Sequence, residues 1–360
     1  MARKGDPLNP ERILIVRLSA LGDVVHVLPA LGALRDRFPA ARFWWITEEL
    51  SAPLLCGHPY LEGVYVLPRK SWERRLKKPA SMVRVVREAL SFFRVLRSMR
   101  FSLALDFQGN LRGALVSRLS GAPITCGFNK QDTLEASHLL HRMHALPAPP
   151  RCHRVERNLQ IPRSLGYKGL DPGPVLPDFK KNGSQEAFLC GLKRPVIACH
   201  PWVSAFGAFK AWTEEGFARF AASAVRAFGG SVIFTWAPSE KEAAERIVSS
   251  AGQGVFLAPK CESIGRLTAL LQGVDLLVAP DTGVLHIADA LRVPVVALFG
   301  PKDPAVYGPR YAPRRIVRSS VSCSPCTKRS CDHRTCMISI TPEMVLEAAS
   351  ELLGTTHGRS

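Results

Sequence analysis

Short apolar runs alternate with longer helical patterns along most of the chain, and this alternation limits the fold more than any other feature. The runs are five or six residues long and lie at 13–18, 42–47, 63–67, 103–107, 195–200, 231–236, 254–258, 275–279 and 294–299. Helical periodicity fills the intervals at 23–37, 80–99, 110–120, 213–228, 238–250, 263–272 and 283–291. Strands that are joined through helices usually pair in parallel, so the pattern predicts parallel sheets with helices on both faces.

The alternation is interrupted once and then starts again. The interruption, GYKGLDPGPVLP at 166–177, is rich in Gly and Pro and continues into polar residues, which is typical of a linker. We therefore predict an α/β fold of two doubly wound domains, 1–177 and 178–340. A C-terminal helix and tail, 341–360, could pack back on the first domain. The ligand is expected in a cleft between the carboxyl ends of the two sheets.

Composition excludes several classes of protein. The chain has 360 residues, of which 46% are apolar and 22% charged, as in a globular protein with sizeable cores. No apolar run approaches the roughly 18 residues that span a bilayer. The polar segment 1–12 leads directly into a strand, so we expect no secretory signal and a cytoplasmic chain with reduced cysteines. Neither a G-x-G-x-x-G nor a P-loop motif occurs, which argues against an oxidoreductase or an ATPase.

Positive charge is concentrated in one part of the sequence. The formal net charge is +18, and residues 69–100 contain eleven Lys and Arg but only Glu73 and Glu88, a net charge of +9. Such an excess indicates either an anionic partner or merely a solvated helix face. The segment RKSWERRLKKP contains Trp72 and is interpreted as a flexible basic loop that closes over a ligand. Its cationic side chains are Arg69, Lys70, Arg74, Arg75, Lys77 and Lys78.

In the second half, polar residues follow three of the predicted strands. Lys210 follows the first of these strands, Glu240 the next, and DTGVLH a later one. The third group comprises Asp281, Thr282, Gly283 and His286. Asp or Thr there could simply cap the following helix. A helix N-terminus beside a cation and a carboxylate also suits a nucleotide diphosphate, whose phosphates and ribose hydroxyls need these groups.

The stretch RLSALGDVVHVLPAL at 17–31 places a single acidic residue, Asp23, directly after the first strand. Asp23 could cap the helix predicted at 23–37, or it could reach into the ligand cleft. His26 lies one turn further along the same predicted helix, and the sequence supports a packing role and a catalytic role for it equally.

Several of these motifs together resemble one enzyme family. LSALGDVVHVLPAL, DFQGNLRGAL, the K-A-W motif at 210–212, PDTGVLHIADAL and LFGPKDP are similar, in the same order, to glycosyltransferase family 9. These are the ADP-heptose:lipopolysaccharide heptosyltransferases of GT-B fold. RKSWERRLKKP, FNKQDTLEASHLLH and VERNLQIPRSLGY resemble most the heptosyltransferase I branch, which adds the first heptose to Kdo. The resemblance covers nearly the whole chain.

The resemblance implies a role for each candidate residue. Asp23 becomes the general base, and Lys210 holds the diphosphate and offsets charge on the departing ADP. Glu240 binds the ribose, and the group from Asp281 to His286 binds sugar and phosphates. The implied reaction is a single inverting displacement that needs no cofactor or divalent metal.

The resemblance also implies the partners. The donor is ADP-heptose, and the acceptor is the Kdo region of lipid A, whose anionic groups suit the basic segment. The enzyme would be a peripheral protein on the cytoplasmic face of the inner membrane. A second inner-core heptose or a protein as acceptor stays open.

A nucleic-acid-binding protein is the alternative from another class, motivated by the basic composition. No aromatic-basic RNA motif occurs, so no nucleic acid is expected as partner. A salt-sensitive shift with short RNA, and none with ADP, would favour that alternative.

Four of the ten cysteines lie in CSPCTKRSCDHRTC. Their C-x2-C-x4-C-x4-C spacing suits a structural zinc or iron site at Cys323, Cys326, Cys331 and Cys336. Some protein-modifying heptosyltransferases are similar in carrying a four-cysteine iron site. Disulfides and free thiols are the alternatives.

Overall fold

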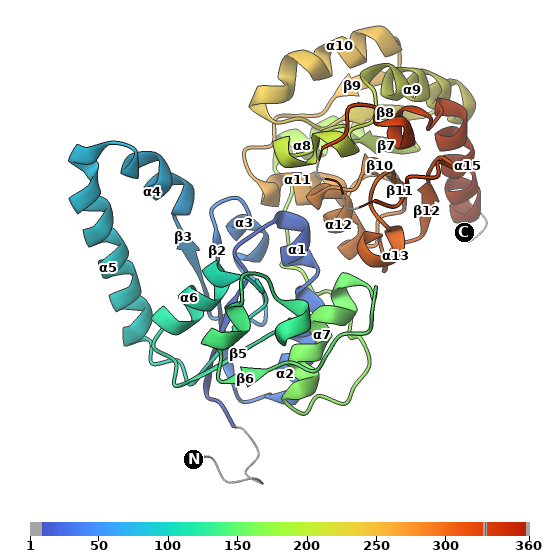
Figure 1. Cartoon of the computed structure of the whole chain (residues 1–360). Helices are drawn as coiled ribbons and strands as arrows, with labels where there is room; N and C mark the ends of the chain where they lie inside the picture. Colours follow the sequence, from blue (N-terminus) through green and yellow to red (C-terminus); the bar gives the residue numbers. More distant parts are fainter. Residues whose placement is uncertain (1–8, 327, 329, 358–360) are drawn as a thin grey trace. The chain divides into compact units, whose positions relative to one another are not determined.

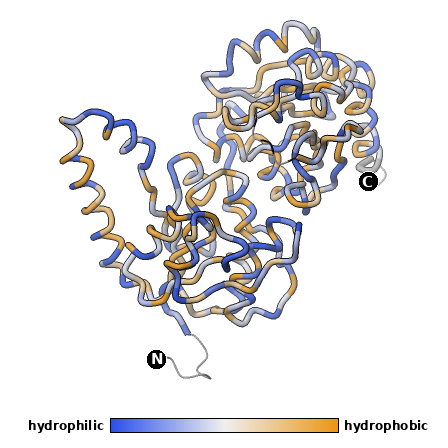
Figure 2. Tube along the Cα trace, in the orientation of Figure 1, coloured by the Kyte–Doolittle hydropathy of each residue, from blue (hydrophilic) through white to orange (hydrophobic). Residues whose placement is uncertain are grey.

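The computed structural model describes residues 9–326, 328 and 330–357, and the chain divides into two units, Met1–Asp178 and Phe179–Ser360 (Figure 1). Each unit is built on a six-stranded sheet whose pairings are all parallel. The predicted α/β fold with two doubly wound sheets is confirmed. Figure 2 shows that hydrophobic residues gather along the strands of both units.

The first unit has the strand order β3-β2-β1-β4-β5-β6. Its strands are β1 (Arg12–Val16), β2 (Arg42–Glu48), β3 (Gly63–Leu67), β4 (Leu103–Asp106), β5 (Ile124–Gly127) and β6 (Met143–His144). Its helices are α1 (Leu21–Val25), α2 (Leu28–Arg37), α3 (Ala52–Leu55), α4 (Arg69–Leu76), α5 (Met82–Ser98), α6 (Leu111–Leu119) and α7 (Arg154–Ser164). β1 and β4 are buried almost throughout, as expected for central strands covered on both faces.

The second unit repeats this topology with the order β12-β11-β10-β7-β8-β9. Its strands are β7 (Val196–Cys199), β8 (Ser231–Phe234), β9 (Val255–Leu257), β10 (Leu276–Pro280), β11 (Val295–Leu298) and β12 (Arg314–Val317). Its helices are α8 (Gly183–Cys190), α9 (Glu214–Phe228), α10 (Lys241–Ala251), α11 (Ile264–Leu271), α12 (Gly283–Ala290), α13 (Pro304–Tyr307), α14 (Thr335–Ile338) and α15 (Pro342–His357).

In each unit the winding direction of the sheet reverses beside its first strand, between β1 and β4 and between β7 and β10. Loops that leave such a switch point diverge to opposite faces, which opens a crevice at the carboxyl ends of the strands. The residues after β1, β4, β7 and β10 are therefore the ones that the fold places for binding.

Helix α9 illustrates how local sequence determines an element. The Thr213 side chain accepts a hydrogen bond from the Gly216 amide and starts the helix, and Gly229, at φ +67°, ends it. Between these signals, Phe217 and Phe220 recur at helical spacing and pack into the core of the second unit.

Three local expectations are wrong. The helix expected at 23–37 is split into α1 and α2, and Pro29 lies in the first turn of the second helix, where proline is tolerated. The expected basic loop is instead the helix α4, in which Arg69 pairs with Glu73 one turn later. The short strands β5, β6 and β12 were not expected at all.

The C-terminal helix α15 packs against α9 and β12, and its Val345 and Ala349 belong to the core of the second unit. It is therefore part of that unit rather than a separate segment. Among the described residues, no helix combines the length and the apolar character that crossing a bilayer requires.

Candidate functional site

In the first unit, Asp23 lies in the first turn of α1, just beyond the carboxyl end of β1. One carboxylate oxygen, Oδ2, accepts a hydrogen bond from the Ala20 amide at 3.2 Å and lies 2.6 Å from Nη2 of Arg17. The side chain is nevertheless 39% exposed. The carboxylate is thus held by Arg17 while it can still meet a ligand. Asp23 is not the N-cap residue, which was one of the two roles considered for it from the sequence. It occupies the third helical position of α1, and Ala20 is the N-cap.

The protonation of Asp23 is controlled by its cationic neighbours. Partial burial by itself raises the pKa of Asp23, but the charge of Arg17, followed by that of Arg154 and the Ala20 hydrogen bond, outweighs it. The pKa is therefore lower than that of an ordinary aspartate, and the side chain is ionised at neutral pH. An ionised, partly exposed carboxylate can accept a proton.

Arg17 is held by the loop that follows β4. Its Nη1 donates to the Phe107 carbonyl at 2.6 Å, and its side chain is nearly buried. In the same loop, Oε1 of Gln108 accepts a hydrogen bond from the Leu18 amide at 3.0 Å. The loop after β4 therefore fixes the segment that carries Asp23.

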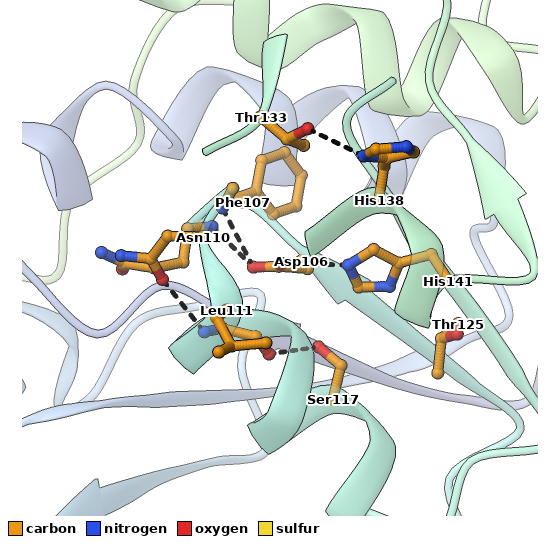
Figure 3. A network of polar contacts seen from close by, with 12 residues as sticks. Asp106, Phe107, Asn110, Leu111, Ser117, Thr125, Thr133, His138 and His141 are labelled. Atoms are coloured by element: carbon orange, nitrogen blue, oxygen red, sulfur yellow. Dashed lines mark hydrogen bonds and ion pairs between the residues drawn. The ribbon is translucent and has the colours of Figure 1, made fainter. Parts of the chain in front are cut away.

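A buried pair anchors the loop after β4 in turn (Figure 3). Oδ2 of Asp106 lies 3.1 Å from Nε2 of His141, both side chains are fully buried, and Oδ1 accepts a hydrogen bond from the Gln108 amide at 2.8 Å. Asn110 then caps α6 by accepting from the Gly113 amide. A Cβ at Gly113 would lie only 2.3 Å from Oδ1 of Asp106, so only glycine fits there.

His26 has a packing environment. It is buried at the end of α1, its ring meets that of His153 edge-on at 5.5 Å, and its carbonyl accepts a hydrogen bond from Asn158. These contacts join α1 to α7. Of the two roles that the sequence left open for His26, the structure favours packing.

In the second unit, Lys210, Asp281 and His286 form one cluster. Nζ of Lys210 donates to Oδ2 of Asp281 at 2.9 Å and to its carbonyl oxygen at 2.6 Å. Nε2 of His286 lies 3.4 Å from Oδ1 of the same carboxylate. Lys210 belongs to the loop after β7 and Asp281 follows β10, so the cluster sits at the switch point of this sheet.

The cluster keeps Asp281 charged. Burial by itself raises the pKa of this carboxyl, but the hydrogen bond from His286 and the charge of Lys210 lower it to about 2. An ammonium group has three hydrogens to donate, and two of those of Lys210 are used. One remains for a ligand oxygen.

The N-terminus of α12 lies directly beside this cluster. Thr282 is the N-cap residue, but its side chain accepts no capping hydrogen bond, and its buried Oγ1 has no hydrogen-bond partner within the described residues. The carboxylate of Asp281 pairs with Lys210 and His286 instead. Neither Asp281 nor Thr282 therefore caps α12 as the sequence allowed, and in the described part of the chain no side chain accepts a capping hydrogen bond from the first-turn amides from Gly283 onward.

Glu240 follows β8, the neighbour of β7 in the sheet. Its Oε2 accepts a hydrogen bond from the Ala237 amide at 2.7 Å, and partial burial raises its pKa. Among the residues that the structure describes, no hydrogen bond or ion pair joins Glu240 to the Lys210 cluster. The two lie at the carboxyl ends of adjacent strands.

The candidate cations of α4 differ in their surroundings. Arg69 pairs with Glu48 and Glu73, and Arg75 makes two hydrogen bonds to Glu88. The other four cations, Lys70, Arg74, Lys77 and Lys78, have no carboxylate partner within the part of the chain that the structure describes. Lys70 and Arg74 line an open hollow of about 440 Å³ together with Glu48, Glu49, Leu50 and Ser71. This hollow is formed within the first unit alone.

The sequence model of Glycosyltransferase family 9 (heptosyltransferase) matches residues 89–337, well over half of the chain. The chain belongs to this family. The expectation drawn from its motifs is confirmed, and the chain is a glycosyltransferase.

Relatives and solved structures extend the match to most of this family 9 enzyme, with one structure covering 95% of the chain. Lipopolysaccharide heptosyltransferase 1 of Pseudomonas aeruginosa is 29% identical over 333 residues, covering 90% of this chain and 88% of the relative. The Escherichia coli K12 protein of the same name is also 29% identical, over 82% of this chain and 90% of its own. The structure "E. coli heptosyltransferase WaaC with ADP" superposes with a TM-score of 0.76 at 23% identity, covering 95% and 99%. This superposition supports the GT-B fold.

The metal site that the cysteine spacing predicts is not found among the described residues of this family 9 enzyme. Within residues 9–326, 328 and 330–357, no three His, Cys, Asp or Glu side chains are arranged to hold a metal ion. Cys323 is exposed, whereas Cys336 is buried in the core beside Met337. Burial, with the neighbouring thiols, raises the pKa of Cys336, which favours the protonated thiol. All four cysteines are free, so the disulfide alternative is also wrong.

Sequence reasoning missed Arg17 and Gln108 as members of the site. Gln108 stands inside a motif that carries the family resemblance and Arg17 directly precedes another, but neither residue is acidic, nucleophilic or part of a charge cluster. The one available signal is position: Arg17 lies at the end of a predicted strand and Gln108 directly follows another, where ligands bind in this class of fold.

Proposed function

We propose that this enzyme transfers a heptose from ADP-heptose to the Kdo region of the lipopolysaccharide inner core, with inversion at the anomeric carbon. The observation that carries the proposal is the Lys210–Asp281–His286 cluster beside the uncapped N-terminus of α12, in a chain of the heptosyltransferase family. Relatives named lipopolysaccharide heptosyltransferase 1 support the choice of acceptor.

The donor is assigned to the second unit. The third hydrogen of the Lys210 ammonium group and the first-turn amides of α12 suit the diphosphate, because both present positive charge to an anion. The unpartnered Oγ1 of Thr282 can donate to the same ligand. Glu240 follows β8, which neighbours β7, so it lies at the same carboxyl edge of the sheet as Lys210. Its carboxylate suits the ribose hydroxyls.

The acceptor is assigned to the first unit, with Asp23 as the general base. The acceptor hydroxyl oxygen attacks the anomeric carbon, its proton passes to the carboxylate of Asp23, and the bond from the anomeric carbon to the phosphate oxygen breaks on the opposite face. The electron pair leaves on ADP, and Lys210 offsets the charge that develops there. Direct displacement inverts the anomeric centre without a covalent enzyme intermediate and requires no cofactor.

Anionic groups of the acceptor suit the cations of the first unit that have no carboxylate partner. Lys70 and Arg74 line the hollow beside α4, and a guanidinium group can hold a carboxylate or phosphate through two parallel hydrogen bonds. Because the proposed acceptor is a lipid, we also propose that the enzyme is a peripheral protein on the cytoplasmic face of the inner membrane.

The direct test is incubation of the purified chain with ADP-heptose and Kdo-lipid A, with the product mass as readout. The proposal predicts a gain of one heptose residue and release of ADP. Parallel reactions should contain an acceptor that already carries one heptose and a protein acceptor. Transfer to either of these, with none to Kdo-lipid A, would replace the proposed acceptor. Absence of transfer from ADP-heptose to any of them would refute the proposal.

A further inference from the structure

Helix α5 carries an apolar stripe on its outward side. Its inner side packs through Val85 and Leu96, which are buried. On the outside, Val83 is 72% and Leu90 61% exposed, and Met82 and Val86 are about half exposed. At 100° per residue these four positions fall within about one third of the helix circumference. They therefore form one continuous stripe rather than scattered apolar residues.

Cations border this stripe along one edge. Arg87 follows Val83 by four residues and Arg94 follows Leu90 by four, so each arginine lies one helical turn from an exposed apolar side chain. Arg84 lies further round the helix on the same side, about 60° beyond Arg87. The two acidic residues nearby are already engaged, Glu73 with Arg69 and Glu88 with Arg75. Within the described residues, Arg87 and Arg94 have no carboxylate partner and Glu88 is engaged mainly by Arg75, so the border of the stripe is positively charged.

The N-terminal half of α5 stands away from the sheet with α4 (Figure 1). The two helices are fastened to each other, because Trp72 meets Phe92 edge-on at 6.0 Å and Arg75 pairs with Glu88 at 2.7 Å. The stripe is thus presented on a braced helical pair. The cations of α4 without a carboxylate partner add charge to the same pair.

We propose that the Met82–Val86–Leu90 face of α5, with Arg84, Arg87 and Arg94 at its edge, docks on the surface of an anionic lipid bilayer. A helix with an apolar stripe and a cationic border lies in the plane of the headgroups, with the stripe in the acyl boundary and the cations on lipid phosphates. Charge complementarity favours an anionic bilayer over the other partners. A second copy of the chain would bring two positively charged borders together, and a nucleic acid would leave the apolar stripe uncovered. This inference rests on the proposed function, because docking on the bilayer would bring the enzyme to its proposed lipid acceptor.

The test is flotation of the full chain with vesicles of phosphatidylethanolamine and phosphatidylglycerol. The variant Val83→Ser/Val86→Ser/Leu90→Ser should lower the vesicle-bound to free ratio at least about tenfold, since each exposed apolar side chain contributes to partitioning. Arg84→Gln/Arg87→Gln/Arg94→Gln should lower binding to a similar extent, and its effect should shrink in uncharged phosphatidylcholine vesicles. Leu139→Ser/Leu170→Ser, two strongly exposed leucines elsewhere in the first unit, is the matched control and should bind as the wild type does.

A second readout separates this proposal from the proposed function. With a water-soluble, deacylated Kdo acceptor, both α5 variants should keep wild-type turnover, because none of their positions belongs to the site. Wild-type binding to anionic vesicles through the stripe without any transfer would uphold the docking surface and refute the proposed function. Docking is overturned if the wild type does not bind anionic vesicles, if the serine variant binds as well as the wild type, or if the stripe instead mediates a dimer in solution.

Discussion

Asp23 shows how cationic neighbours, Arg17 above all, set the chemistry of a carboxylate. Arg17 approaches to 2.6 Å and, despite partial burial, keeps the pKa of Asp23 below its usual range. A base of low pKa is weak, but Asp23 is unprotonated at neutral pH. In the proposed reaction it need only take a proton that leaves as the new bond forms.

Replacing Arg17 should therefore move the acidic limb of the pH profile. Arg17→Met removes the positive charge beside Asp23. The apparent pKa of the acidic limb of kcat/KM should therefore rise by about 1 to 3 pH units, because an adjacent opposite charge shifts a pKa by that much. Arg17→Lys keeps the charge and should shift the limb far less. The measurement is kcat/KM between pH 4 and 8. An unchanged limb in Arg17→Met would show that Arg17 does not control Asp23.

Asp281 offers a stability test of the donor cluster. Its pKa is about 2 in the folded chain and about 4 in an unfolded one, so its ionised form stabilises the fold above pH 4, and this is lost as the pH falls through 2. The full effect is about 2 to 3 kcal/mol, of which roughly half disappears by pH 3. Urea unfolding of wild type and Asp281→Asn should therefore give curves that converge on acidification. A constant difference between pH 6 and 3 would contradict the assigned pairing.

Residues differ in how far the sequence reveals them. Asp23, Lys210, Asp281 and His286 carry chemical groups at strand ends within specific motifs, so they could be predicted. Arg17 could not, because its role depends on which way its side chain turns after β1 and on the Phe107 carbonyl that receives it. Long-range contacts of this kind leave no local pattern.

At the scale of elements, periodicity predicts long helices and buried strands well. α9 and α5 follow their apolar spacing, and β7 and β10 are fully buried runs. β6 has two residues and cannot establish a pattern. The sequence predicts a loop where α4 lies, because the high charge of this segment obscures the Arg69–Glu73 pair within the helix. The contact of Trp72 with Phe92 of α5 is long-range and leaves no local pattern.

The two adjacent arginines of α4 provide a matched pair. Arg74 lines the hollow, whereas Arg75 is committed to Glu88. Arg74→Ala should raise the acceptor KM several-fold and leave the donor KM within about twofold, with an effect that fades as added salt shortens the screening length to below about 8 Å. Arg75→Ala should affect the acceptor KM less. Equal effects of the two substitutions, or an effect of Arg74→Ala on the donor, would refute the assignment of Arg74.

At the scale of the whole molecule, we propose that the unit Met1–Asp178 binds the acceptor and carries the base, and that the unit Phe179–Ser360 binds the donor. The repeat of one strand order in both units agrees with such a division, because each sheet has its own switch point. The Gly- and Pro-rich interruption at 166–177 predicts two domains but not which of them binds donor or acceptor. It could not predict that α15 completes the second core, because a terminal helix carries no signal for its partner.

The turnover number of Asp23→Asn, measured with ADP-heptose and Kdo-lipid A, tests the central claim most directly. The substitution keeps the shape of the side chain and removes its ability to accept a proton, so kcat should fall by roughly 10² to 10⁴. The ADP affinity of the same variant, measured by calorimetry, should be unchanged because the proposed donor residues belong to the other unit. Near-normal turnover of Asp23→Asn would contradict the account.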